Sequence, residues 1–148
     1  MTQATEDLLE LDQQVCFALA VASRNVIALY RPILEPLGLT HPQYLVMLAL
    51  WGKAPLRFGE VAELLRLDPA TLSPLVKRLE QSGLIERHPV EGDERTFELV
   101  PTESGRALRE QALGVPPAVI EQLGMPIDRL VALRDELSAV IDATDSVK

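Results

Sequence analysis

Residues 66–101 constrain the fold most, because a well-delimited helix is followed at once by a hairpin pattern. The segment LDPATLSPLVKRLEQSG places Asp68 before Pro69 and Gly83 just past the last apolar position, which are the usual signals at the two ends of a helix. A short strand-like piece and a helix of about two turns around residues 61–65 precede it. Two helices separated by a few residues indicate a helix-turn-helix.

A β-hairpin is predicted directly after this helix pair. In LIERHPVEGDERTFELV, apolar and polar residues alternate on both sides of the polar, glycine-containing stretch VEGDE. Alternation of this kind across a short polar turn is typical of two antiparallel strands. The sequence therefore predicts a winged helix-turn-helix over residues 40–101.

Helical patterns flank the winged part on both sides. In the region 7–36, residues 7–31 repeat apolar positions at helical spacing, and the helix is expected to end near Pro32 and Pro36. Residues 102–146 form a helical tail broken by prolines and glycines. We expect a mainly α fold with a small β-hairpin wing, an α+β architecture. The flanking helices present more apolar surface than one small domain can cover, which favours dimerisation through these regions. The alternative is that they fold back on their own domain.

A further helix is expected after Thr40, where Thr40 and Gln43 have capping-box spacing. The residues that follow are apolar on nearly all sides, so this helix should be buried at the centre of the domain.

Charge and composition limit the partners. The net charge of −8 argues against a nucleic-acid partner at first, but residues 66–80 carry three basic and two acidic side chains between acidic flanks. No uninterrupted apolar run is long enough to span a bilayer, and the acidic start differs from a signal peptide. A lone cysteine indicates a cytoplasmic protein. With two histidines, His41 and His88, and one cysteine, we expect no metal site and no cofactor.

The second helix of the pair carries the side chains expected to contact DNA, which are Thr71, Ser73, Lys77 and Arg78. Small hydroxyl side chains can approach base edges closely, and the basic pair suits phosphate or guanine. Apolar residues of the same helix would hold it to its own core: Leu72, Leu75, Val76 and Leu79. The alternative is a solvated helix face, since all four polar residue types are common there.

The wing offers further candidates for DNA contact. Asp93 and Arg95 are two residues apart in an extended chain, so their side chains point the same way and Asp93 can pair with and orient Arg95. An oriented arginine on a hairpin suits a narrow, electronegative minor groove. Arg87, at the start of the hairpin, adds a second cation. The alternative is a surface ion pair worth about 0–1 kcal/mol.

At this point the sequence resembles the MarR family of winged-helix repressors over nearly its whole length. The resemblance rests on DPATLSPLVKRLEQSGLIERH, DERT and ELVPTESG. The N-terminal part, LDQQVCFALAVASRNVIALYRPILEPLGLTHPQYLVMLALW, is similar to the organic-hydroperoxide-sensing repressors of the OhrR type. The family resemblance implies that Thr71 and Ser73 lie on the recognition helix and that Asp93 supports Arg95 in the wing.

The subfamily resemblance also assigns a role to Cys16. It implies that Cys16 is the peroxide sensor and that Tyr30 hydrogen-bonds the cysteine across the dimer. Two departures stand out: His41 occupies the position of a second tyrosine, and the last third of the chain has no cysteine. The chain is therefore similar to the one-cysteine members. An imidazolium at His41 could stabilise the thiolate, or His41 could simply fill the first turn of its helix.

The residues themselves limit how such a thiol could work. Within one helix, Tyr30 lies about 20 Å from Cys16, so a contact needs a dimer partner or a sharp bend. Oxidised Cys16 could form a mixed disulfide with a small cellular thiol or be over-oxidised. We expect a homodimeric repressor, with operator DNA as its partner and organic hydroperoxide as its inducer, that is not an enzyme.

Two alternatives remain open. In one, a small aromatic ligand releases the DNA and Cys16 only packs. In the other, the protein is a thiol peroxidase helped by a group such as Arg24, which would leave the winged part unexplained.

Overall fold

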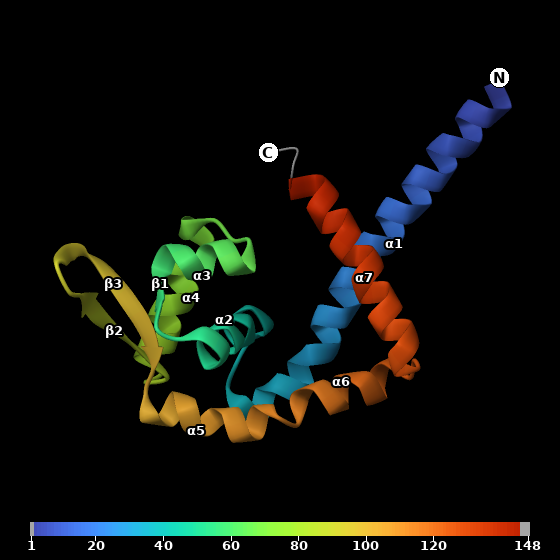
Figure 1. Cartoon of the computed structure of the whole chain (residues 1–148). Coiled ribbons are helices and arrows are strands. Elements are labelled where there is room, and N and C mark those ends of the chain that lie inside the picture. Colours follow the sequence, from blue (N-terminus) through green and yellow to red (C-terminus); the bar gives the residue numbers. More distant parts are fainter. Residues whose placement is uncertain (1, 146–148) are drawn as a thin grey trace.

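The computed structural model describes residues 2–145, apart from the side chains of residues 2–8, 11–13 and 94. The helices are α1 (Thr2–Leu34), α2 (His41–Lys53), α3 (Phe58–Leu65), α4 (Pro69–Gln81), α5 (Glu103–Ala112), α6 (Val115–Leu123) and α7 (Ile127–Asp145), with a 3-10 turn, η1 (Glu35–Leu37). The strands are β1 (Leu56–Arg57), β2 (Ile85–Val90) and β3 (Asp93–Pro101). The winged part lies at one end of the molecule, and α1, α6 and α7 extend from it (Figure 1).

The winged helix-turn-helix is built as expected. The three strands pair in the order β1-β3-β2, all antiparallel, with Leu56 opposite Leu99 and Ile85 opposite Pro101. One apolar core joins α2, α3, α4 and the sheet, and its fully buried members include Met47, Val61 and Leu79. The mainly α fold with a small wing is confirmed.

The start of α2 confirms the predicted capping box. The backbone N–H of Gln43 donates to the Thr40 hydroxyl, and the backbone N–H of Thr40 donates to Gln43 Oε1 at 3.0 Å. Buried side chains line this helix, among them Val46 and Leu50. The helix lies at the centre of the winged part, as its sequence indicates.

Helix α4 begins and ends where the sequence predicts. Pro69 occupies the first turn after Asp68, and Gly83 follows the end with a positive φ of 76°. Asp68 occupies the N-cap position, but its side chain makes no capping hydrogen bond. The turn before α4 is closed by Arg66, whose φ of 55° lies in the left-handed region that few residues other than glycine adopt.

Helix α1 ends between Pro32 and Pro36, where the sequence predicts, and it begins before residue 7, earlier than predicted. It continues through Pro32 to Leu34, and the chain turns at η1 and Gly38. A proline removes one backbone donor and strains the preceding turn, but this helix ends two residues later, where little helix remains to be broken. The helical tail is divided into α6 and α7 at Gly124, whose φ is 64°.

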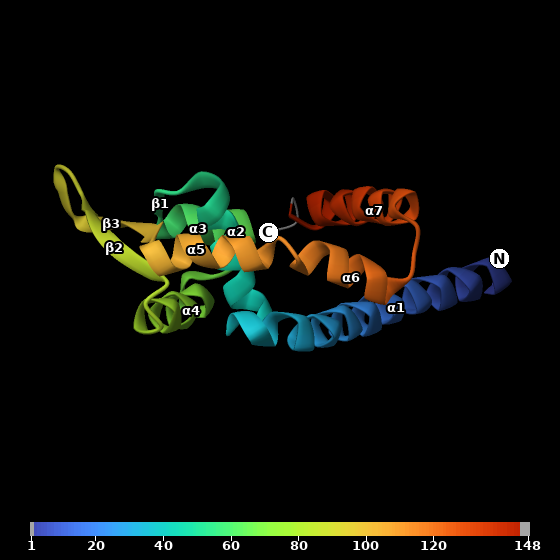
Figure 2. The ribbon, with the colours of Figure 1, turned by 90° about the horizontal axis from the view of Figure 1, so that it is seen from below.

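Many apolar side chains of α1 and α7 face solvent. On α1 they are Leu9, Val15, Phe17, Leu19 and Ile27, and on α7 they are Ile127, Val131, Leu133, Val140 and Ile141. No residue of α7 is buried. In Figure 2, α7 stands off from α1. These helices therefore leave their apolar surface uncovered within one chain.

One helical stretch among the described residues, Gln14–Leu37, has the length and apolar composition of a bilayer-spanning segment. Arg24 and Arg31 lie within this stretch, so it is not an uninterrupted apolar run, and the expectation that no such run is long enough still holds. Length and composition alone do not separate a membrane span from a helix that another protein covers.

Replacement of Gly105 by alanine is expected to destabilise the fold strongly. A Cβ atom at Gly105 would overlap the carbonyl oxygen of Leu84, which is backbone and already accepts from the N–H of Thr102. Overpacking of this kind typically costs about 1–3 kcal/mol or more, or several degrees in melting temperature. Thermal denaturation of Gly105→Ala should show this loss. Gly114→Ala is the matched control, because its nearest atom would be 3.6 Å away; equal melting temperatures for the two variants would contradict the prediction.

Candidate functional site

Helix α4 presents the four predicted DNA-contacting side chains on its solvent face. Thr71, Ser73, Lys77 and Arg78 are all exposed. The opposite face anchors the helix, with Leu72, Val76 and Leu79 fully buried and Leu75 half-buried. The helix therefore combines a fixed position with an exposed polar and basic surface, which is the arrangement needed for contact with a DNA groove.

Asp93 organises the wing differently from the predicted ion pair. Its carboxylate accepts from the backbone N–H of Arg95 at 3.0 Å and from the Thr96 hydroxyl at 2.6 Å. Among the described ion pairs, none joins the carboxylate of Asp93 to the guanidinium of Arg95. Asp93 thus fixes the backbone that carries Arg95, while the exposed Arg95 side chain extends from the hairpin.

The electrostatics of the wing agree with this geometry. The Thr96 and Arg95 hydrogen bonds hold the pKa of Asp93 below its usual value, and the positive charge of Arg57 adds to the effect. Sequence reasoning missed Arg57. It joins the sheet because β1 pairs with β3, with Arg57 opposite Glu98, and a two-residue strand carries no signal of its partner.

Arg87 is held within the protein. Its Nε donates to Glu80 of α4 at 2.7 Å, and its guanidinium carbon lies 4.3 Å from the centre of the Phe97 ring. The ion pair joins the wing to α4, and the cation–π contact joins the two strands of the wing. In this position Arg87 orients the wing, in addition to the charge it was predicted to offer DNA.

Cys16 lies on the part of α1 that extends away from the winged domain, and it is exposed. It therefore fills no core within one chain. Tyr30 is on the same uninterrupted helix, about 20 Å farther along. The structure does not bring Cys16 to Tyr30 or His41 within one chain.

Tyr30, His41 and Tyr44 form an aromatic cluster where α1 meets α2. The ring centres of Tyr30 and His41 are 4.8 Å apart in an edge-on arrangement, and those of Tyr30 and Tyr44 are 6.0 Å apart. Burial raises the pKa of both tyrosines, and for Tyr44 the neighbouring Tyr30 adds to the rise. Burial lowers the pKa of His41, so the neutral imidazole predominates at neutral pH. This environment opposes the imidazolium role considered for His41.

The protein is expected to become less stable as the pH is lowered, because of His41. Folding holds the pKa of His41 below its ordinary value of 6.5, so below that pH the unfolded chain binds a proton that the folded chain resists. The contribution of His41 is complete above pH 6.5 and is lost as the pH falls through its folded pKa. Denaturant unfolding at about pH 7.5 and 5.5 should show a smaller loss in His41→Phe, which keeps a ring against Tyr30. An equal loss in both proteins would contradict the prediction.

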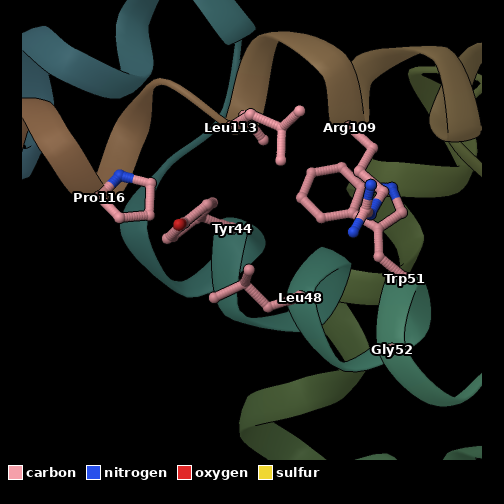
Figure 3. Close-up of a pocket in the computed structure, with 8 residues that line it drawn as sticks. Tyr44, Leu48, Trp51, Gly52, Arg109, Leu113 and Pro116 are labelled. Carbon is pink, nitrogen blue, oxygen red and sulfur yellow. The ribbon is translucent and has the colours of Figure 1, made fainter.

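A cavity of about 240 Å³ lies between α2 and the start of the helical tail. Figure 3 shows Tyr44, Leu48 and Trp51 of α2 facing Arg109, Leu113 and Pro116. Its lining is apolar and aromatic apart from the guanidinium of Arg109, which sequence reasoning did not single out. The Trp51 indole N–H is already used, since it donates to the Gly105 carbonyl at 2.9 Å.

Tyr44 and Trp51 line this cavity together, whereas Phe17 and Leu19 are exposed on α1 near Cys16. In the part of the chain that the structure describes, no group of three or more histidine, cysteine or acidic side chains could hold a metal.

Comparison with known proteins gives consistent matches. The model of the MarR family matches residues 39–97. The organic hydroperoxide resistance transcriptional regulator of Bacillus subtilis is 41% identical over 114 residues, which are 77% of this chain and 78% of that protein. Reduced AbfR bound to DNA, a Staphylococcus epidermidis protein, superposes with a TM-score of 0.79 at 30% identity, covering 95% of this chain and 98% of that one. The repressor CouR bound to a 23-mer DNA duplex gives 0.81 at 26% identity, covering 89% and 95%.

Proposed function

This chain belongs to the MarR family of transcriptional regulators, and from that premise we propose that it is a homodimeric repressor whose DNA affinity is controlled by oxidation of Cys16. Organic hydroperoxide is the oxidant in this proposal. The observation that carries it is the joint presence of an exposed recognition helix and an exposed thiol on an uncovered apolar helix. The chain acts as a regulator in the cytoplasm and not as an enzyme.

Operator DNA contacts α4 and the wing in this proposal. Thr71 and Ser73 approach base edges, and Lys77 and Arg78 contact phosphate or guanine. Arg95 reaches the adjacent minor groove from a hairpin that Asp93 holds in shape. The DNA-bound structures of AbfR and CouR support this assignment by their likeness to this chain.

The dimer is formed by residues 7–36 and 102–146, while residues 40–101 contact DNA. The exposed apolar side chains of α1 and α7 support this division, because a single soluble chain rarely leaves so much apolar surface uncovered. Covering of Gln14–Leu37 by a second copy also accounts for its apolar character without a membrane. A two-fold dimer would place two copies of α4 on successive turns of the major groove.

In the dimer, Tyr30 and His41 of a second copy support the Cys16 thiolate. The length of α1 between Cys16 and Tyr30 excludes a contact within one chain. Both groups are held neutral by their surroundings, so the phenol O–H and an imidazole N–H donate hydrogen bonds rather than positive charge. Hydrogen bonding to the charged form lowers the pKa of a thiol and increases the fraction of reactive thiolate.

The redox step proceeds at the sulfur of Cys16. The thiolate attacks the terminal oxygen of the hydroperoxide, so that an S–O bond forms and the O–O bond breaks. The alkoxide leaves with a proton as the alcohol, and the sulfur becomes a sulfenic acid. A small cellular thiol then displaces water from the sulfenic acid to give a mixed disulfide. A bulkier polar group between the apolar helices of the dimer interface shifts these helices. This shift changes the distance between the two winged domains that contact DNA.

A second function is favoured by the cavity beside Tyr44 and Trp51. Its aromatic lining and the Arg109 guanidinium suit a small aromatic ligand whose binding releases DNA. In that case Cys16 would contribute only to the dimer seam, and oxidants would leave DNA binding unchanged.

Replacement of Arg95 by alanine tests the proposed contact between the wing and DNA. Each phosphate-neutralising cation contributes about 0.9 to the slope of log K against log salt concentration, so removing one should reduce that slope by about 1. Fluorescence polarisation with a labelled duplex at several salt concentrations measures this slope. Arg134→Ala on α7 is the control, since its guanidinium lies beside Asp135 away from the wing. Equal slopes for wild type and Arg95→Ala would remove the wing from the DNA interface.

A further inference from the structure

A carboxylate at the end of α7 contacts the turn of the helix-turn-helix. Arg66 of the turn forms an ion pair with Asp145, the last residue of α7, although the two are far apart in the sequence. Figures 1 and 2 show α7 folding back after α6, so that its C-terminal end points toward the winged part. Among the described ion pairs, this one alone joins α7 to the winged domain.

Arg66 is the C-cap residue of α3, three positions before Pro69, the first residue of α4. In helix-turn-helix proteins the first helix of the pair crosses the phosphate backbone. The left-handed backbone of Arg66 and the bond from its N–H to the Glu63 carbonyl hold it in the turn. Its side chain is 52% exposed even with Asp145 in contact. A guanidinium held there suits bidentate contact with a phosphate.

The surroundings of Arg66 allow a phosphate to replace Asp145 as its partner. A shallow hollow beside it is lined by Lys53, Glu60 and Glu63 as well as by apolar residues. Glu60 already accepts from the backbone N–H of Arg57 at 2.9 Å. Asp145 is itself 35% exposed, so the pair is in contact with water and is weak enough for a phosphate to displace the carboxylate.

The position of α7 depends on few contacts within one chain. No residue of this helix is buried, and its two ends are fixed by the turn after α6 and by the Asp145 contact. Any movement of α7 against the rest of the molecule therefore changes the distance between Asp145 and Arg66.

We propose that Arg66 is a DNA phosphate contact and that Asp145 competes with the phosphate for it. Helix α7 then weakens DNA binding while Asp145 holds Arg66, and strengthens it when the carboxylate moves away. This inference rests on the proposed DNA-binding function and adds a contact between the dimerisation region and the winged domain. Since an exposed ion pair is worth little, the effect on DNA affinity should be about two- to fivefold.

The test compares Asp145→Asn with wild type in full-length protein, using a labelled duplex of arbitrary sequence at several salt concentrations. Asp145→Asn should bind about two- to fivefold more tightly, and its slope of log K against log salt should steepen toward the value for one additional phosphate contact, about 0.9. In an Arg66→Gln background the same substitution should have no effect. Asp142→Asn removes an equal charge one turn earlier on α7 and should leave both quantities unchanged.

Each result decides between the possibilities. Unchanged affinity and slope in Asp145→Asn would overturn the inference, as would equal tightening in the Arg66→Gln background or in Asp142→Asn, because these would show a general charge effect. If wild type binds no duplex at any salt concentration, the proposed function fails together with this inference. Melting temperatures of all variants, measured alongside, should equal that of wild type.

Discussion

Replacing Cys16 with serine is expected to leave the protein bound to its operator after treatment with an organic hydroperoxide that releases the wild type. Serine keeps nearly the same size but cannot form the thiolate that attacks the O–O bond. Conformational coupling of this type typically changes affinity by about 5- to 150-fold, so oxidised wild type should lose that much affinity and Cys16→Ser none. Fluorescence polarisation on a labelled operator duplex, before and after one equivalent of hydroperoxide, measures the difference.

The same experiment separates the competing functions. If wild type and Cys16→Ser both stay bound after oxidation, Cys16 is only a packing residue and the aromatic-ligand function becomes the better account. Turnover of hydroperoxide in the presence of a reductant, rather than stoichiometric consumption, would instead indicate a peroxidase. Untreated Cys16→Ser should bind the duplex as tightly as wild type, which controls for damage to the fold.

Introducing a charge at Phe17 is expected to abolish operator binding by separating the dimer. Phe17 is 68% exposed in one chain, and it lies next to Cys16 on the helix proposed to form the seam. A glutamate there would be buried without a partner against the second copy, which costs far more than the contact it replaces. Loss of the second half-site should reduce operator affinity to the non-specific level, about 10³-fold or more weaker. Sedimentation or size-exclusion with light scattering, together with polarisation, checks both results.

A matched substitution controls for the added charge. Asn25→Glu places the same carboxylate on an exposed position of α1 away from most of its apolar residues, and it should leave dimer and DNA binding intact. A Phe17→Glu protein that remains dimeric and binds the operator would show that the seam lies elsewhere.

The winged part could be predicted from sequence because its signals are local. Pro69 and Gly83 mark the two ends of α4, and the alternation on both sides of VEGDE marks the hairpin. The capping box at Thr40 and Gln43 was predictable for the same reason. Each of these signals depends on residues within one turn or one strand pair, so no knowledge of the tertiary structure is needed.

Contacts between elements could not be predicted in this way. The bond from Arg87 to Glu80, the stacking of Arg87 on Phe97 and the contact of Arg66 with Asp145 all join residues whose approach depends on the packing of whole elements. For Asp93 the correct pair of residues was predicted but the wrong atoms, because the carboxylate binds the backbone N–H of Arg95 instead of its guanidinium.

The thiol site is the part that sequence and a single chain leave incomplete. Cys16 and Tyr30 are separated by the length of a continuous helix, and His41 packs on Tyr30 rather than near Cys16. Their meeting depends on how a second copy covers the apolar residues of α1. That arrangement is a property of the dimer, so neither helical periodicity nor the fold of one chain fixes it.

The most direct measurement titrates the protein–operator complex with an organic hydroperoxide while following polarisation and the intact mass of the chain together. The proposed function predicts that release rises in proportion to oxidised Cys16 and is complete at about one equivalent per chain, with the added mass of one oxygen, or of one small thiol when that thiol is present. Complete oxidation of Cys16 with the operator still bound would contradict the central claim.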